Sequence, residues 1–202
     1  MTTQPQTKNL AELYELDLLK WDEVRRVLET NPTQEPGTGG PDHHTFWLST
    51  TDADGRPHMT GVGAFWLDGQ YYFCGSPRSR KIRNIERDPR CALGVAVHGF
   101  DVAVEGRAIR VTDNARLQRL ASLFAEGGWA PTVADGGFTH EYSAPSAGPP
   151  PWHVYEVTVE DVYAVATKEP GGATRWTFGS AQIPGRLDSS MPPSRSRIRH
   201  GG

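Results

Sequence analysis

The spacing of apolar and polar residues divides the chain into a helical segment, a strand-rich middle and polar ends. From Leu10 to Leu28 apolar residues recur at steps of three and four, which predicts an amphipathic helix over this range. Asn31-Pro32 ends the predicted helix, because the residue before a proline avoids the helical region. A loop rich in proline, glycine and threonine follows from Thr33 to Asp42.

Short segments rich in β-branched and aromatic residues fill the middle of the chain, which is typical of strands. Asp68-Gly69 between two of these segments predicts a two-residue hairpin turn. Many strands joined by turns, with few helices, predict a mostly β fold, either an antiparallel barrel or a sandwich. The predicted strands are Thr45–Thr51, Pro57–Leu67, Gln70–Gly75, Cys91–Val97, Val102–Val111, Trp152–Val159, Val162–Thr167 and Thr174–Phe178.

Two further helices are predicted between these strands. The first runs from Arg80 to Arg87, with Ser79 as its N-cap, and Asp88-Pro89 ends it. The second follows Thr112 or Asp113 as a cap and ends at Gly127-Gly128. Its apolar stripe consists of Leu117, Leu120, Ala121 and Phe124.

Residues 127–151 form a long stretch without a clear periodic pattern. Connections of this length in a compact domain are usually functional or disordered. The stretch carries Trp129, Phe138, His140 and Tyr142, which can stack on or hydrogen-bond to a small organic molecule. We therefore hypothesise that it borders the substrate side of a binding site, and a plain surface insertion is the alternative.

Composition narrows the class of protein. A length of 202 residues predicts one domain. The net charge of -3, from 21 basic and 24 acidic residues, gives the protein no overall positive charge that would attract nucleic acid. The longest apolar run, Cys91–Val97, is too short to cross a membrane, and Met1–Thr7 lacks a secretory signal pattern. Two cysteines, Cys74 and Cys91, form no disulfide framework, so a reduced cytoplasmic protein is expected.

The strongest candidate for chemistry is the junction between a predicted strand and the helix that begins at Arg80. Ser76, Arg78 and Ser79 precede Arg80-Lys81 at the start of this helix. A helix N-terminus offers free N–H groups and a partial positive charge, to which arginine and lysine add donors and charge. Basic residues at a helix start oppose the helix dipole, which favours an anion site such as one for a terminal phosphate. The alternative is a solvated basic helix face.

Other motifs are weaker. Gly61-Val62-Gly63 resembles part of a dinucleotide fingerprint, but no helix follows, so these glycines are better interpreted as strand positions that admit a flat ring. His43-His44 has no second pair of metal ligands at a useful spacing, so no metal site is predicted. The other histidines are scattered, and Cys74 has the pattern of a small core residue.

The chain resembles the pyridoxamine 5'-phosphate oxidase-like family, the flavin and deazaflavin split-barrel proteins. The resembling pieces follow in family order over residues 43–178: Ser49–Met59, Phe65–Gln70, Ser79-Arg-Lys-Ile-Arg-Asn-Ile85 with Asp88-Pro89-Arg90, Val104–Ala108 and Thr174-Arg-Trp-Thr-Phe178. The resemblance implies a mostly β fold: a six-stranded antiparallel split β-barrel with a few short flanking helices. Residues 43–178 would form this domain, residues 1–42 an N-terminal helical extension and loop, and residues 179–202 a disordered tail.

The resemblance also implies a cofactor groove at the interface of a homodimer. Arg80 and Lys81 would grip the cofactor phosphate, with Ser79 and Ser76 assisting and Cys74 and Gly75 beside them. The strand Met59–Ala64 would run along the ring of the cofactor with its N–H groups facing the ring edge. These ring-side residues are Met59, Thr60, Gly61, Val62, Gly63 and Ala64, and the other subunit would contribute residues near Trp152, Arg175 and Trp176. No catalytic residue is assigned, because the cofactor carries the chemistry.

The end of the match bears on the choice of cofactor. Pyridoxamine phosphate oxidases end in a basic motif with a substrate-binding histidine, whereas this match ends at Thr174–Phe178. That ending looks more like the actinobacterial branch that uses coenzyme F-420, and the excess of 17 arginines over 4 lysines fits a high-GC genome. The expected function is hydride transfer between reduced F-420, or next FMN, and a small organic substrate. The alternatives are a non-catalytic carrier of flavin, deazaflavin or haem, and an FMN-dependent oxidase-like enzyme.

Overall fold

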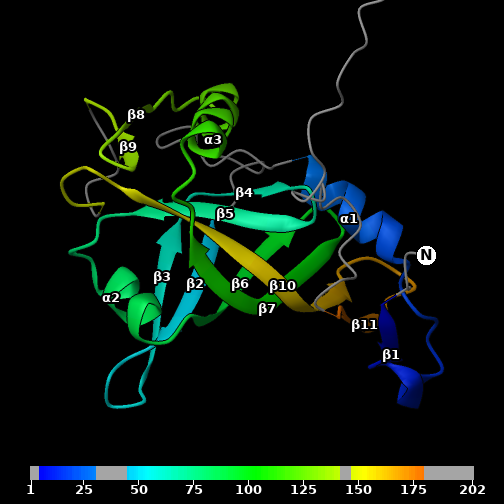
Figure 1. The fold of residues 1–202 in the computed structure, drawn as a ribbon. Coiled ribbons are helices and arrows are strands. Elements are labelled where there is room, and N and C mark those ends of the chain that lie inside the picture. The colour runs from blue at the N-terminus through cyan, green and yellow to red at the C-terminus, as the bar shows by residue number, and fades with distance from the viewer. Residues whose placement is uncertain (1–4, 31–44, 142–146, 180–202) are drawn as a thin grey trace, which may run out of the picture.

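The predicted strands form a curled antiparallel sheet in the computed structural model, which describes residues 5–30, 45–141 and 147–179 (Figure 1). Strands β3 and β4 follow one another in the chain but pair with different neighbours, and the barrel is split between them. The sheet order is β1-β11-β10-β7-β6-β2-β3, and β5 pairs with both β10 and β4. The strands are β1 (Gln6–Asn9), β2 (Phe46–Thr51), β3 (Pro57–Val62), β4 (Ala64–Leu67), β5 (Gln70–Gly75), β6 (Arg90–Val97), β7 (Phe100–Arg110), β10 (His153–Ala166) and β11 (Ala173–Thr177).

The predicted mostly β split barrel is confirmed, but its strand count is larger than six. The main sheet of the described residues has nine strands. One reason is that the predicted strand Pro57–Leu67 breaks at Gly63 into β3, which pairs with β2, and β4, which pairs with β5. The other is that β1 and β11 extend the sheet beyond β10.

The two strands predicted between Trp152 and Thr167 are one continuous strand, β10. A β-bulge between Val159 and Asp161 changes its register against β7. The extra residue lets Val159 and Val162 both face the core although they are three positions apart. The polar pair Glu160-Asp161, which separates the two predicted strands, therefore marks a bulge.

The helix predicted from Leu10 to Leu28 is wrong in its first half. Helix α1 spans Trp21–Glu29, and β1 and a 3-10 turn (Glu12–Tyr14) precede it. Side-chain hydrogen bonds take the place of helical ones here: Asn9 accepts from the Ala11 N–H and donates to the Leu16 carbonyl. Four residues of the predicted apolar stripe, Leu10, Leu13, Tyr14 and Leu18, are exposed as a result.

Helix α1 covers one end of the barrel. Its Trp21 packs against Trp66, Trp176 and Phe178, with ring centroids 5.1–6.3 Å apart. The interior of the barrel is filled by residues of the strands, including Phe46, Leu48, Tyr71, Phe73, Tyr155 and Val157. Residues 5–30 are thus part of the main sheet and its core.

A second core lies on the outer face of β5 and β10, beneath helix α3 (Asn114–Glu126) and a small hairpin, β8 (Thr132–Ala134) and β9 (Gly137–Thr139) (Figure 1). The stretch 127–151 is therefore structured in part, and its Phe138 is fully buried. The ring centroids of Trp129 and Trp152 lie 5.6 Å apart in this core. Tyr142 lies outside the described residues, so the substrate-side hypothesis for this stretch stays a prediction.

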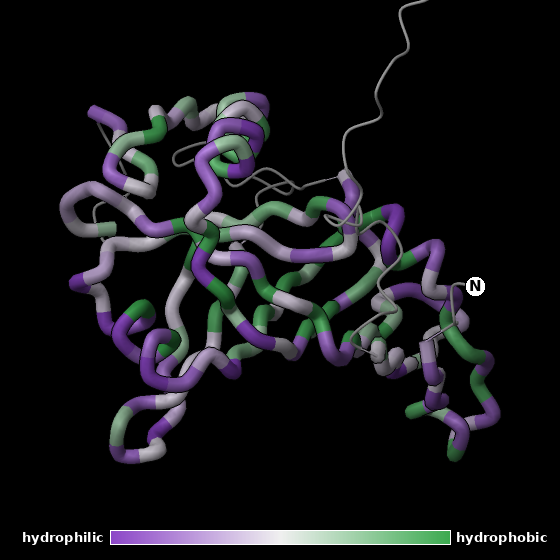
Figure 2. Tube along the Cα trace, viewed as in Figure 1, coloured by the Kyte–Doolittle hydropathy of each residue, from purple (hydrophilic) through white to green (hydrophobic). Residues whose placement is uncertain are grey.

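Both later helices begin where the capping pattern predicts. Asp113 caps α3 by accepting a 2.8 Å hydrogen bond from the Arg116 N–H. Helix α2 spans Arg80–Arg87, and Figure 2 shows it as mostly hydrophilic. Its Ile82 and Ile85 are buried in the core of the barrel. None of the helices in the described ranges is long and apolar enough to cross a membrane.

Candidate functional site

The N-terminus of α2 lies directly after β5 and has no side-chain cap. Ser79 occupies the cap position, but its hydroxyl donates to the Ser76 carbonyl at 2.7 Å, and its N–H donates to the same oxygen. Ser76 is itself buried and accepts from the Arg78 N–H. The N–H groups of the first helical turn therefore keep their capacity to bind an anion.

Lys81 is a mostly buried cation without an anion. Its side chain and backbone together are only 9% exposed, and among the described residues its ammonium group has no hydrogen bond or ion pair. Burial lowers the pKa of Lys81, and the nearby Cys74 opposes this shift. Buried lysines are rare unless they are paired, so this one is an unusual feature that a phosphate would satisfy.

Gly75 allows this arrangement by having no side chain. A Cβ atom at Gly75 would lie 3.2 Å from Lys81 Cε and 3.0 Å from Ile82 Cγ1. Such contacts are tighter than normal packing, so a larger residue would displace the lysine. Cys74, the preceding residue, faces the second core, and burial raises the pKa of its thiol to about 12. Cys74 thus packs as predicted for a core residue.

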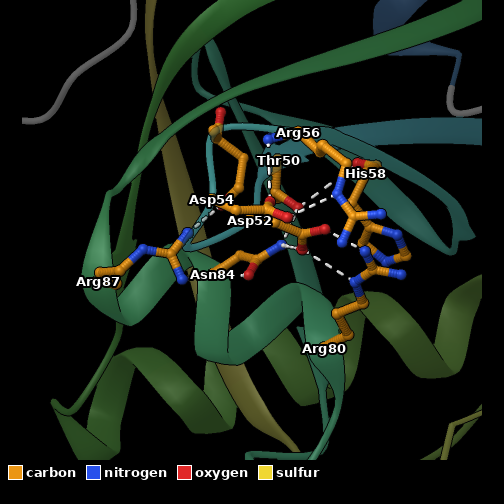
Figure 3. Close-up of polar contacts among 9 residues, drawn as sticks. Thr50, Asp52, Asp54, Arg56, His58, Arg80, Asn84 and Arg87 are labelled. Carbon is orange, nitrogen blue, oxygen red and sulfur yellow. Dashed lines mark hydrogen bonds and ion pairs between the residues drawn. The ribbon is translucent and has the colours of Figure 1, made fainter.

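Arg80 is held by an acidic residue of the turn between β2 and β3. The guanidinium forms an ion pair with Asp52, using both Nε and Nη2 (Figure 3). Asn84 donates to the same carboxylate at 2.9 Å. The hydrogen bond from Arg80, then that from Asn84, holds the pKa of Asp52 well below its usual range, so this carboxylate stays ionised.

Strand β3 provides an open edge beside this region. It is the last strand of the described sheet and pairs only with β2. Met59 is 63% exposed, and Gly61 is exposed opposite Trp47, which is 50% exposed. Ala64, by contrast, is fully buried in β4, so the residues Met59–Ala64 do not form one continuous face.

The structure divides the predicted site residues into groups. Cys74, Gly75, Ser76, Ser79, Arg80 and Lys81 meet where β5 ends and α2 begins, and Trp152 is close because its neighbour His153 pairs with Gly75. Trp152 is buried, however, and its Nε1 donates to the Gly148 carbonyl.

Arg175 and Trp176 lie elsewhere in the same chain. Their strand β11 pairs with residues 161–165 of β10, and Arg175 lies opposite Tyr163. Tyr163 is about 33 Å along β10 from His153, the residue that pairs with Gly75, given about 3.3 Å per residue. Trp176 is buried against α1, and Arg175 lies 3.9 Å from Asp161. Within one chain, Arg175 therefore lies far from the residues at the start of α2.

The residues that sequence reasoning missed are Asp52, Asn84 and Thr50. Asn84 links Asp52 on the β2–β3 turn to α2, and it donates to Thr50 Oγ1 as well. Asp52 and Arg80 are 28 positions apart, and no local pattern predicts such a pair. The one available signal is that a strand ending in an acidic turn precedes a strongly basic helix.

The comparison with protein families agrees with this geometry. The sequence model of the pyridoxamine 5'-phosphate oxidase family matches residues 38–166, which is more than half of the chain. The chain therefore belongs to the pyridoxamine 5'-phosphate oxidase family. A comparison with proteins of curated function finds no match.

Solved structures share the fold. A pyridoxamine 5'-phosphate oxidase-related, FMN-binding protein from Nostoc punctiforme is 16% identical, with a TM-score of 0.54 over 82% of this chain and 94% of that one. A haem-binding protein from Mycobacterium smegmatis is 18% identical, with a TM-score of 0.53 over 83% and 62%. A NimC/NimA family protein from Clostridium acetobutylicum is 12% identical, with a TM-score of 0.51 over 76% and 90%. Identities this low support a common fold and no more.

The residues at the start of α2 fit a flavin-type cofactor that carries a phosphate. Lys81 supplies an unpaired positive charge, α2 supplies uncapped N–H groups, and Gly75 supplies the space. The open edge of β3 supplies backbone hydrogen-bonding groups for a ring.

Proposed function

We propose that this protein is an oxidoreductase that binds a flavin-type cofactor between the β3 edge and the start of α2. The observation that carries the proposal is Lys81, a mostly buried lysine at an uncapped helix N-terminus whose ammonium group has no counter-ion in the part of the chain that the structure describes. A phosphate placed there would satisfy the lysine and the helix at once. When bound, the cofactor would supply hydride transfer to or from a small organic substrate.

The protein's own residues would bind and orient the cofactor. Lys81, Arg80 and the first turn of α2 would hold the phosphate, with Ser76 and Ser79 shaping the loop beneath it. Backbone groups on the free side of Met59–Val62 would hydrogen-bond to the edge of the ring. Gly61, which lacks a side chain at the exposed edge, would admit a flat ring close to the backbone.

Reduced coenzyme F-420 is the preferred cofactor of this proposal and FMN the second. The ending Thr174–Phe178 supports F-420, since it resembles the actinobacterial branch. The test is a fluorescence titration of the purified protein with FMN and with F-420, and riboflavin as a control that lacks the phosphate. We expect tighter binding of F-420 than of FMN, and weak binding of riboflavin. Binding of neither phosphate-bearing compound would contradict the proposal.

A carrier function without turnover is the second candidate. The observation that favours it is the shared fold with a haem-binding protein. An absorption spectrum of the protein as purified identifies a bound flavin, deazaflavin or haem. A single-turnover experiment with reduced cofactor and a panel of small oxidants then decides, because a carrier leaves the cofactor reduced and an enzyme oxidises it.

A homodimer is the expected assembly, as the family resemblance implies, but the aromatic residues of the last strands do not require it. Trp152, Tyr155, Trp176 and Phe178 are all buried within one chain, so they need no partner. Trp47 and Met59 are the large apolar residues left exposed beside the β3 edge, and a second copy would cover them.

We expect light scattering to give twice the mass of one chain at micromolar concentration. Trp47→Glu should shift the protein to monomer, since it places a charge at the apolar face. Tyr14→Glu is the matched control, because Tyr14 is also exposed but lies in the N-terminal turn. A monomeric parent protein would contradict the assembly. The cytoplasmic location stays a prediction.

A further inference from the structure

The ion pair between Arg80 and Asp52 leaves part of the guanidinium available. Asp52 accepts from Nε at 2.9 Å and from Nη2, so both contacts lie on one side of the planar group. Nη1 has no hydrogen-bond partner among the described residues, and the arginine side chain is half exposed. Because the guanidinium is a rigid fork, fixing one side also fixes the direction of the other.

Asp52 is itself held from several directions. Its backbone N–H donates to the Arg56 carbonyl, and its carbonyl accepts from the Gly55 N–H, which closes the β2–β3 turn. Its carboxylate accepts from Asn84 on α2. Asn84 in turn is buried and donates to Thr50 on β2 (Figure 3). The carboxylate therefore has a defined place between the turn and the helix.

We propose that Asp52 is a positioning residue of the phosphate site, holding Arg80 so that its free Nη1 donors face an anion at the start of α2. The inference rests on the proposed function, because it concerns the same site. Asp52 does not contact the anion and acts through Arg80. A flexible arginine would have to be ordered at the moment of binding, and the ion pair orders it beforehand.

If Asp52 instead competed with the anion for Arg80, its removal would change the affinity in the opposite direction. A carboxylate beside an anion site can compete with the anion for the arginine. Removing the negative charge would then strengthen anion binding, whereas removing a positioning residue weakens it. The sign of the change in affinity therefore separates the two roles.

The experiment compares Asp52→Asn with the parent protein by fluorescence titration. Asparagine keeps the size of the side chain and is well tolerated in turns. The probes are FMN with riboflavin, and F-420 with its phosphate-free riboflavin-like core, so that each pair differs by the phosphate group. We expect the phosphate-bearing member to bind roughly three- to tenfold more weakly, and the phosphate-free member to bind unchanged.

Two further variants make the result specific. Asp54→Asn is the matched control: Asp54 lies in the same turn and pairs with the exposed Arg56, and it acts on Arg80 through its charge alone, so the variant should change the affinity much less than Asp52→Asn does. In an Arg80→Ala background, Asp52→Asn should cause no additional loss, because its effect passes through the arginine. Tighter binding by Asp52→Asn, equal losses for phosphate-free probes, or a loss that persists without Arg80 would each overturn the inference.

The outcome also separates this inference from the proposed function. If Arg80→Ala and Lys81→Ala both leave the affinity for phosphate-bearing probes unchanged, the phosphate site is wrong and the role of Asp52 falls with it. If those variants weaken binding and Asp52→Asn does not, the phosphate site stands and only the positioning role is wrong.

Discussion

Replacing Lys81 by alanine is expected to weaken cofactor binding by roughly ten- to a hundredfold. The variant removes a charge-assisted contact worth about 1.5–3 kcal/mol. It also removes a cation that is costly to bury without an anion, so the protein without cofactor should not become less stable. Fluorescence titration measures the affinity, and thermal unfolding without cofactor measures the stability.

Lys20→Ala is the matched control for this prediction. Lys20 is an exposed lysine paired with Glu23 at the start of α1, so the variant loses the same charge away from the site. Arg80→Ala should weaken binding as Lys81→Ala does, and the salt dependence of binding should fall in both variants. Unchanged affinity in both would move the phosphate site elsewhere in the molecule.

The second large effect is expected on stability, in the contact that fastens α3 to the barrel. Arg116 on α3 forms an ion pair with Glu156 of β10 and donates to the Tyr72 hydroxyl of β5 at 2.8 Å. Tyr72 also donates to Glu156 at 3.0 Å. The glutamate side chain is only 8% exposed, so Arg116 is its main compensating charge.

Arg116→Ala should therefore lower the free energy of unfolding by about 3 kcal/mol, the low end for a broken buried pair, since the arginine is itself half exposed. Denaturant unfolding measures it. Arg119→Ala on the same helix is the control: its pair with Asp68 is exposed, and its loss should cost under about 1 kcal/mol.

A double variant tests the assignment further. Glu156→Gln removes the buried charge, so adding it to Arg116→Ala should cost less than the sum of the two single changes. Strict additivity, or a change in Arg116→Ala no larger than in Arg119→Ala, would contradict the view that this pair fastens α3.

Elements with strong local signals could be predicted from the sequence. Helix α2 spans Arg80–Arg87 as expected, because Asp88-Pro89 ends it locally. Strand β5 spans Gln70–Gly75 as expected, because Asp68-Gly69 can adopt the positive φ angles that the hairpin requires. Local sequence signals also identified the basic residues at the start of α2 as the candidate site.

Elements whose form depends on distant residues could not be predicted. The stripe from Leu10 to Leu28 has helical spacing, but its first half pairs with the edge of β11: the Leu10 N–H donates to the Ala173 carbonyl and the Leu19 N–H to Thr174 Oγ1. The energy of that pairing overrides local propensity, which is a weak preference. The bulge in β10 likewise depends on both neighbouring strands, since it changes the register against β7.

The sequence by itself determined the strand-rich class, the hairpins and the cationic residues placed at a helix start, because turn residues and caps act over a few positions. Only the tertiary structure decided which of those cations is paired. It joins Arg80 to Asp52, 28 positions away, and buries Lys81 with no ion pair to any residue in the ranges 5–30, 45–141 and 147–179. The physical reason is that charge compensation depends on distance in space and on exclusion of water, and the folded chain alone defines both.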